Sequence, residues 1–207
     1  MTGVQTCALP IFAFKVFEEK LYFVSTGERS SFLKSLDSQG SFSSLTGDNG
    51  AVHDFDLCPE GIAFCALRGM GLQELYLLTG GKEKQLTFFN KDYLSKKNIV
   101  PAETMVFQNN GFNVHYVVLK PGNFDHSRKY PALLYIHGGA KVLYGPVFFH
   151  EMQVLANRGF FVIYGNPRGS DGQGSLFARL QGHYGEPDYQ DIDRKSTRLN
   201  SSHESPS

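Results

Sequence analysis

Two patterns of hydrophobic and polar residues divide this chain near residue 100. From about Phe12 to Asn90, apolar and aromatic residues form short alternating runs, separated by turns rich in Gly, Asn, Asp and Ser. This alternation predicts antiparallel strands. Beyond residue 100 the apolar runs become continuous, as in "PALLYIH" and "FFVIYG", which predicts strands buried on both faces of a parallel sheet.

The first pattern repeats at an interval of 41 residues. Three positions of one unit recur in the next: Leu45, Thr46 and Asn49 as Leu86, Thr87 and Asn90. The run "LYFVSTG" near Leu21 is likewise similar to "IAFCALRG" near Ile62. A period of about 40 to 45 residues of short strands is typical of a four-stranded propeller blade, because one blade cannot bury both of its faces alone. A chance match between two unrelated pairs of hairpins is the alternative.

The second pattern combines a hairpin with a strand–helix–strand unit. Asn110-Gly111 separates "TMVFQN" from "FNVHYVVLKP", and it favours a two-residue hairpin turn because both central positions of that turn take positive φ. Further on, "PVFFHEMQVLANRG" predicts a helix with Pro146 at its start and Gly159 just past its end. Its apolar residues at helical spacing are Phe148, Met152, Leu155 and Ala156. Strand, helix and strand in this order predict a βαβ unit with a right-handed crossover.

A His-Gly-Gly sequence follows the first of the continuous strands. Two glycines at this place allow a sharp turn that points backbone N–H groups into an open cleft, where they can bind the oxyanion of an acyl-transfer intermediate. Gly138 and Gly139 are therefore candidate oxyanion residues. A histidine such as His137 more often has a structural role than a role in proton transfer.

A polar, glycine-rich turn, "NPRGSDGQG", follows the second continuous strand. Its place at the carboxyl edge of the predicted sheet is where α/β proteins bind ligands. Ser170 is not predicted to be a nucleophile, because the nucleophile elbow needs Gly two residues before the serine and this position is Arg168. We expect Arg168 to form a structural ion pair or to order the loop, in preference to binding substrate.

The segment from Lys129 to Ile192 resembles the prolyl oligopeptidase family of serine peptidases, on its acylaminoacyl-peptidase and dipeptidyl-peptidase side. It contains, in the order of the family pattern, a His-Gly-Gly turn, a Tyr-Gly, a helix with E-x-Q-x-L-A, the run NPRGS-x-G-x-G and DY-x-D. The run "ELYLLTGGKEKQLTFFN" similarly resembles the last propeller blade of such enzymes. Ala140 replaces the usual Pro, and Gln173 stands where an aromatic residue is common.

This resemblance implies β-propeller blades followed by the N-terminal part of an α/β-hydrolase domain. Residues 12–97 would be the C-terminal blades, and residues 98–193 would begin the catalytic domain. The family's activity implies hydrolysis of short peptides by a Ser-Asp-His triad without metal or organic cofactor, in which His activates Ser and Asp orients His. Gly139 would supply one oxyanion donor, with Gly138 and His137 shaping the turn.

The triad of the family is not found in this sequence. In the family a G-x-S-x-G elbow follows DY-x-D by some tens of residues, and Asp and His come later, whereas sixteen residues follow Asp191 here. We therefore expect a fragment of a peptidase that is itself inactive. Residues 1–11 and 194–207 lack periodicity and resemble translated adapter text, so we predict them to be non-native tails. A natural disordered tail is the alternative for these segments.

Two other functions fit part of the sequence. A carboxylesterase or lipase could use the same His-Gly-Gly turn, although such enzymes do not need the preceding propeller-like strands. A propeller that acts as an interaction module, with a degenerate hydrolase appendage, is the non-enzymatic alternative.

Composition narrows the predicted partners and location. Lys plus Arg and Asp plus Glu both number 20, so no net charge attracts nucleic acid or an anionic membrane surface. No apolar run has the length of a transmembrane helix, and no export signal is recognised. Cys7, Cys58 and Cys65 lack metal-ligand spacing and predict free thiols in the cytoplasm, with a Cys58–Cys65 disulfide as the less favoured alternative. We expect a short peptide as the substrate, and the sequence makes no prediction of oligomeric state.

Overall fold

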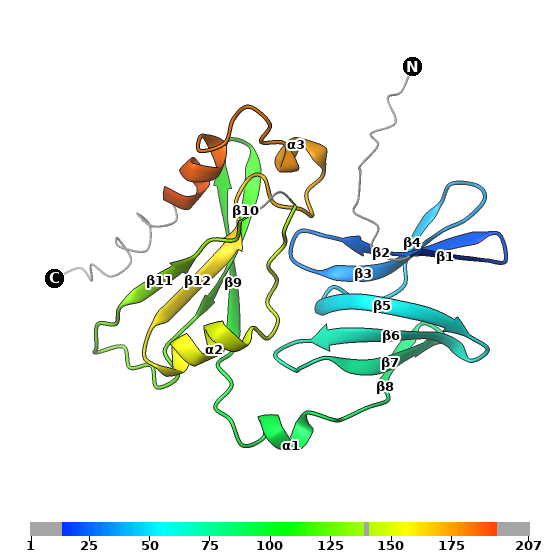
Figure 1. The fold of residues 1–207 in the computed structure, drawn as a ribbon, viewed down its shortest axis with the longest axis horizontal. Helices are drawn as coiled ribbons and strands as arrows, with labels where there is room; N and C mark the ends of the chain where they lie inside the picture. Colours follow the sequence, from blue (N-terminus) through cyan, green and yellow to red (C-terminus); the bar gives the residue numbers. More distant parts are fainter. Residues whose placement is uncertain (1–13, 139–140, 194–207) are drawn as a thin grey trace.

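The computed structural model describes residues 14–138 and 141–193, which form two β-sheets. Figure 1 shows the sheet of β1 to β8 beside a smaller sheet of β9 to β12, with a connection through the short helix α1 (Lys91–Leu94). The larger sheet contains β1 (Phe14–Phe17), β2 (Lys20–Thr26), β3 (Ser31–Leu36), β4 (Phe42–Ser44), β5 (Gly50–Cys58), β6 (Gly61–Arg68), β7 (Glu74–Thr79) and β8 (Lys82–Gln85). The predicted change of architecture near residue 100 therefore coincides with the passage from one sheet to the other.

The larger sheet consists of two four-stranded antiparallel units. In the first unit β2 pairs with β1 and β3, and β3 pairs with β4. In the second unit β6 pairs with β5 and β7, and β7 pairs with β8. A single parallel bridge between Ser31 and Ala51 joins β3 to β5. The strands predicted to be antiparallel are thus antiparallel within each unit.

The repeated Leu-Thr pairs occupy equivalent places in the two units. The Leu45 N–H donates to the Leu33 carbonyl oxygen, and the Leu33 N–H donates to Oγ1 of Thr46 at 3.0 Å. In the second unit the Leu86 N–H donates to the Leu75 carbonyl oxygen, and the Leu75 N–H donates to Oγ1 of Thr87 at 2.9 Å. The repeat read from the sequence is therefore a structural repeat, and the chance match is wrong.

The apolar core of this part lies between the two units. Val24 and Leu33 of the first unit pack with residues of the second, among them Phe55, Phe64 and Tyr76. Phe55 is 4% exposed, whereas Phe14, which stands 41 residues earlier, is 64% exposed. The stacking of one unit on the next buries the apolar face that remains open on the first unit.

The smaller sheet has the strand order β11-β12-β10-β9. Its strands are β9 (Ala102–Asn109), β10 (Phe112–Leu119), β11 (Ala132–Tyr135) and β12 (Phe161–Asn166). β9 and β10 form the predicted hairpin, in which Asn110 has φ 49° and Gly111 has φ 81°. β11 and β12 are parallel and are joined by α2 (His150–Asn157), so the predicted βαβ unit is confirmed.

Helix α2 packs on the smaller sheet through its predicted apolar face. Met152 and Ala156 are buried in the cluster that also contains Val162 and Tyr164 of β12. Gln153 is buried as well, and its side-chain amide both accepts from the Val100 N–H and donates to the Val100 carbonyl oxygen. This pair of bonds ties the connection between the sheets to the helix.

Two local predictions for the smaller sheet are wrong. The helix begins at His150 and not near Pro146, because Phe149 has extended backbone dihedral angles (φ −119°, ψ 116°). β11 is not buried on both faces, since Ala132 is exposed and its other three residues are half-buried, and it is also the edge strand of the described sheet. The rule for buried parallel strands assumes that other elements cover both faces of the sheet. β12 does lie between two strands, and Val162, Ile163 and Tyr164 are at most 2% exposed.

The two cysteines of the larger sheet are not bonded to each other. Cys58 and Cys65 are free thiols, so the alternative disulfide is wrong. Cys7 lies outside the described residues. Within residues 14–138 and 141–193, no helix combines the length and the apolar character that a bilayer crossing requires. The predicted tails, 1–11 and 194–207, also lie outside the described residues.

Candidate active site

The segments that follow β11 and β12, which contain the His-Gly-Gly sequence and the run NPRGSDGQG, begin at the same edge of the smaller sheet. β11 and β12 run parallel, so the segment after Tyr135 and the segment after Asn166 both leave the sheet at its carboxyl edge. His137 and Gly138 follow β11 at this edge. Gly138 is exposed, and a Cβ atom added to it would meet nothing within 4 Å. Gly139 and Ala140 lie outside the described residues, so the oxyanion role of Gly139 stays a prediction.

His137 is bonded to the turn that follows β12. Its Nε2 atom lies 3.0 Å from Oγ of Ser170. Ser170 is 1% exposed, so a substrate cannot reach its hydroxyl in this conformation. This contact agrees with the structural role expected for His137 and with the rejection of Ser170 as a nucleophile.

Backbone and amide hydrogen bonds join the same two segments. The Lys141 N–H donates to the Gly169 carbonyl oxygen at 3.2 Å, and the Asp171 N–H donates to the Val142 carbonyl oxygen at 3.2 Å. The Asn166 side chain accepts from the Tyr144 N–H and donates to the Tyr144 carbonyl oxygen, both at 2.7 Å. Together with the His137–Ser170 contact, these bonds hold the segment after β11 against the turn after β12.

Tyr144 packs beside His137 in this arrangement. The two rings are edge to face, with their centroids 5.2 Å apart, and Tyr144 also contacts Phe149 and Tyr164. Burial, and to a smaller extent the Glu151 carboxylate, raise the pKa of the Tyr144 phenol. The phenol therefore stays neutral near pH 7 and supports the His137 ring through packing.

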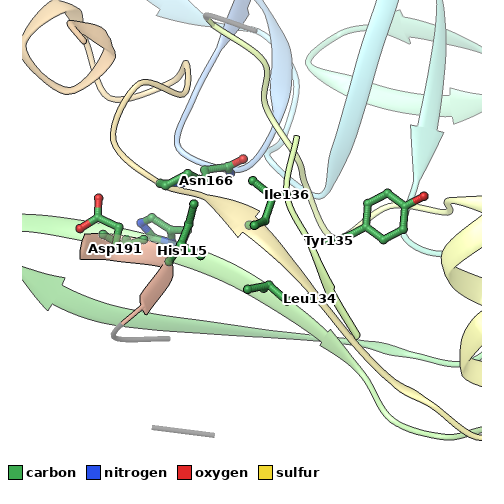
Figure 2. A pocket seen from close by; sticks show the side chains of 10 residues that line it. His115, Leu134, Tyr135, Ile136, Asn166 and Asp191 are labelled. Atoms are coloured by element: carbon green, nitrogen blue, oxygen red, sulfur yellow. The ribbon is translucent and has the colours of Figure 1, made fainter. Parts of the chain in front are cut away.

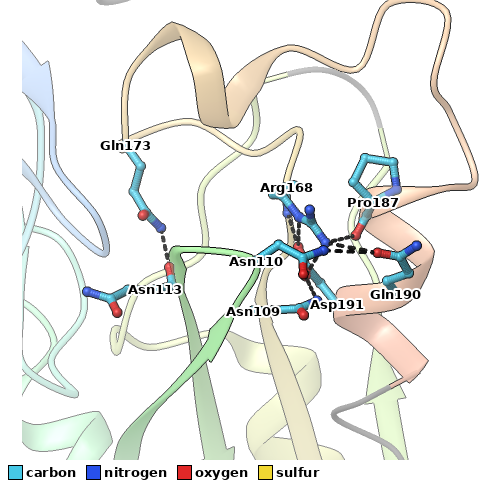
Figure 3. Close-up of polar contacts among 8 residues, drawn as sticks. All are labelled: Asn109, Asn110, Asn113, Arg168, Gln173, Pro187, Gln190 and Asp191. Carbon is cyan, nitrogen blue, oxygen red and sulfur yellow. Dashed lines mark hydrogen bonds and ion pairs between the residues drawn. The ribbon is translucent and has the colours of Figure 1, made fainter.

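Arg168 forms the structural ion pair that the sequence analysis favoured. Its guanidinium donates to both carboxylate oxygens of Asp191 at 2.9 Å, and its backbone N–H donates to Asp191 as well. Figure 3 shows this network, in which Asn109 of β9 also donates to Asp191. Asp191 is 1% exposed and lies in the helical segment 187–193, so the pair anchors this segment to the turn after β12.

Gln173 stabilises the far end of the same turn. Its side-chain amide donates to the Asn113 carbonyl oxygen at 2.7 Å, as Figure 3 shows. A phenylalanine at this position has no side-chain donor and could not make that bond. The departure from the family pattern at Gln173 is therefore accommodated by a contact with the start of β10.

A small hollow lies beneath the site, between the two parallel strands and β10. Figure 2 shows His115, Leu134, Ile136, Asn166 and Asp191 around it. Its volume is about 10 Å³. This is room for one water molecule at most, so the hollow cannot accept a peptide.

The end of β2 and the loop between β2 and β3 reach the site from the larger sheet. Oγ1 of Thr26 donates to the Asp171 carboxylate at 2.8 Å, and the Glu28 carboxylate lies 2.6 Å from Nε2 of His115. Gly145 and Gly172 allow this close approach, because a Cβ atom at either position would collide with a carbonyl oxygen of this loop. No pattern in the sequence indicates these contacts, which join residues more than 80 positions apart.

Comparisons with known proteins agree with the resemblance. Residues 146–200 match the model of the prolyl oligopeptidase family. The chain is 33% identical over 176 residues to a Bacillus subtilis protein named "Uncharacterized peptidase YuxL", covering 83% of this chain and 27% of that protein. It is 35% identical over 117 residues to dipeptidyl-peptidase 5 of Aspergillus fumigatus, covering 54% of this chain and 16% of that protein.

Solved structures give the same result. An acylaminoacyl peptidase of Pyrococcus horikoshii superposes with a TM-score of 0.82 at 29% identity, over 92% of this chain and 31% of that one. A puromycin hydrolase shares the fold with a TM-score of 0.72 at 19% identity, over 93% of this chain and 31% of that one. The chain thus spans about a third or less of the length of each of these relatives.

Fold and sequence together define a member of the serine peptidases. More narrowly, the chain belongs to the prolyl oligopeptidase family.

Proposed function

We propose that the whole protein is a serine peptidase that hydrolyses short peptides through an acyl-enzyme, and that its Ser-Asp-His triad lies outside this chain. Membership of the prolyl oligopeptidase family supports the proposal most directly. The described residues contribute one contact between a serine and a histidine at this edge, Ser170 with His137, and this serine is buried. On this proposal the chain alone is inactive.

The turn after β11 would bind the oxyanion. We assign one backbone N–H donor to Gly139, while Gly138 and His137 shape the turn. The hydrogen bonds from the segment after β12 support this assignment, because a rigid turn costs little reorganisation when charge develops on the substrate. Ser170 and Asn166 are positioning residues on this view, since they act through His137 and Tyr144.

We propose further that the two repeated units are blades of a β-propeller and that the smaller sheet begins an α/β-hydrolase domain. Residues 12–97 and 98–193 would be these two parts. The equivalent Leu-Thr bonds of the two units support the first assignment, and the βαβ unit supports the second. The open apolar face around Phe14 would then be covered by a further unit, as Phe55 is covered here. The free thiols Cys58 and Cys65 support a cytoplasmic location.

Reading the uninterrupted gene tests the peptidase proposal first. We expect a Gly-x-Ser-x-Gly sequence within about sixty codons after residue 193, followed by the Asp and His of the triad. The product of that gene should be labelled by a fluorophosphonate probe at the elbow serine, and the 207-residue chain should remain unlabelled. A gene without the elbow, or a product that the probe does not label, would refute a serine peptidase.

The substrate class needs a second assay on the same product. N-acetyl-aminoacyl p-nitroanilides report acylaminoacyl-peptidase activity, and dipeptidyl p-nitroanilides with a free amine report dipeptidyl-peptidase activity. We expect release of p-nitroaniline from one of the two classes, and release of p-nitrophenol from p-nitrophenyl butyrate only at a lower kcat/KM. Faster ester cleavage would favour the carboxylesterase alternative, which the comparisons do not favour.

A further inference from the structure

We propose that the cavity between the two sheets, at the side of the turn after β11, binds peptides in which an apolar side chain is followed closely by a carboxylate. The inference rests on the peptidase proposal and names the peptides that its site prefers. It concerns residues that are all described in the structure, and none of them belongs to the triad.

The cavity has apolar walls from both sheets. It measures about 680 Å³, which is within the range of volumes that accommodate a small organic ligand. One wall comes from β2, β5 and β6 of the larger sheet, and the other from the segment 141–149 that leads from the candidate oxyanion turn to α2. Its apolar lining includes Val24, Val52, Leu67, Val142, Leu143 and Phe149. An apolar side chain of a peptide would therefore lose contact with water on both sides.

A second, more polar hollow continues from this cavity. It measures about 390 Å³ and shares Lys141 and Asp171 with the first, while Arg179 and Tyr184 line the second hollow only. Lys141 thus stands where the two hollows meet, two residues after the candidate oxyanion residue Gly139. A peptide that extends from the apolar cavity toward the turn would pass this lysine.

The charges around the junction favour an anion. Among the described residues, neither Lys141 nor Arg179 makes an ion pair. The nearby Asp171 is 6% exposed, and its carboxylate already accepts a hydrogen bond from Thr26. Two cations without ion-pair partners therefore line the second hollow together with one carboxylate that is already hydrogen-bonded. A ligand carboxylate next to Lys141 would complete the charge balance.

Binding of three matched peptides to the 207-residue chain tests this inference. The first probe is Ac-Ala-Leu-Phe with a free C-terminal carboxylate. The second is the C-terminal amide of the same peptide. The third is Ac-Ala-Leu-Phe-Glu, also as its C-terminal amide. Calorimetric titration at low ionic strength should show the free acid binding about fivefold more tightly than the amide, with a smaller difference at high salt because exposed charges are screened. If the extended amide binds more tightly than the free acid, the preferred carboxylate is that of an acidic side chain and not that of the peptide C-terminus.

The variants Lys141→Gln and Arg179→Gln should each reduce the advantage of the free acid, and together they should abolish it. Both side chains are exposed, so the thermal midpoint should not move. Lys82→Gln on β8 is the matched control, because this exposed lysine does not line either hollow, and it should leave the advantage unchanged.

The possible results separate the two proposals. Equal binding of acid and amide would overturn the carboxylate preference and leave peptide recognition intact. Absence of binding by every probe would overturn the cavity as a peptide site, while labelling of the whole gene product by the fluorophosphonate would still establish the peptidase. Loss of the labelling together with a retained acid preference would refute the peptidase proposal alone.

Discussion

Ser170 Oγ lies 3.0 Å from Nε2 of His137, and this contact connects the turns that follow the two parallel strands. The distance is that of a nucleophile and its base, but the serine is buried and lies on a turn without the elbow sequence. The contact therefore positions His137, the first residue of the His-Gly-Gly sequence, and does not activate a nucleophile.

If the whole protein is the serine peptidase proposed above, replacing this serine should slow catalysis without removing the nucleophile. In the whole gene product, Ser170→Ala should lower kcat more than it changes KM, because a displaced oxyanion donor acts in the transition state. Fluorophosphonate labelling of the variant should still go to the elbow serine. In the 207-residue chain the same change should cost about 1 kcal/mol of stability, which denaturant unfolding measures.

Ser175→Ala is the matched control for this experiment, since Ser175 is exposed on α3 (Ser175–Ala178). It should change stability by less than about 0.5 kcal/mol. Loss of all labelling in Ser170→Ala, with the fold retained, would contradict the positioning role.

The Arg168–Asp191 pair should be costly to break. Arg168→Met leaves the carboxylate of Asp191 buried without its partner, and such a change costs about 3 to 5 kcal/mol. Urea unfolding of the variant should show the loss. Lys120→Met is the control, because the Lys120–Glu103 pair is partly exposed and should contribute less than about 1 kcal/mol. A similar loss of unfolding free energy in Arg168→Met and Lys120→Met would show that burial of the ion pair does not decide its contribution to stability.

The structural repeat predicts parallel effects at its two threonines. Thr46→Val and Thr87→Val each remove the acceptor of a strand N–H, at Leu33 and Leu75 respectively. Each should cost about 1 to 2 kcal/mol, with the larger loss at Thr87 because its hydroxyl also donates to Glu74. Hydrogen exchange of the Leu33 and Leu75 amides measures both changes site by site. An effect at one amide only would contradict the equivalence of the units.

Glu74 should make the larger sheet sensitive to acid. Burial alone raises the pKa of this carboxyl, but hydrogen bonds from Thr87, Asn90 and the Phe89 N–H outweigh burial and lower it below the ordinary value of 4.5. The folded state therefore favours the ionised form, and its contribution is complete above pH 4.5 and is lost as the pH falls through the lower folded pKa.

Thermal unfolding of the 207-residue chain between pH 7 and pH 3 measures this contribution. The variant Glu74→Gln should be less stable than the natural chain at pH 7, and the difference should shrink on acidification. A difference that stays constant over this range would exclude Glu74 as a source of the acid sensitivity.

Local patterns were sufficient for most of the fold. The Asn110-Gly111 hairpin, the strand–helix–strand unit and the repeated Leu-Thr pairs depend on turn chemistry and on periodicity, which are written in neighbouring residues. The exact start of α2 was not predictable in this way, because the extended conformation of Phe149 delays the helix. The exposure of β11 depends on which elements pack over its faces, and its composition contains no such information.

The site shows the same division between local and tertiary information. The sequence by itself determined the motifs at the carboxyl edge, the family, and the rejection of Ser170 as a nucleophile, since these follow from residue types at short spacing. Only the tertiary structure decided that Ser170 bonds His137, that Arg168 bonds Asp191, and that Thr26 and Glu28 reach the site from the other sheet. Such contacts form when packing brings distant segments together, and hydrogen bonds and ion pairs act only at short range.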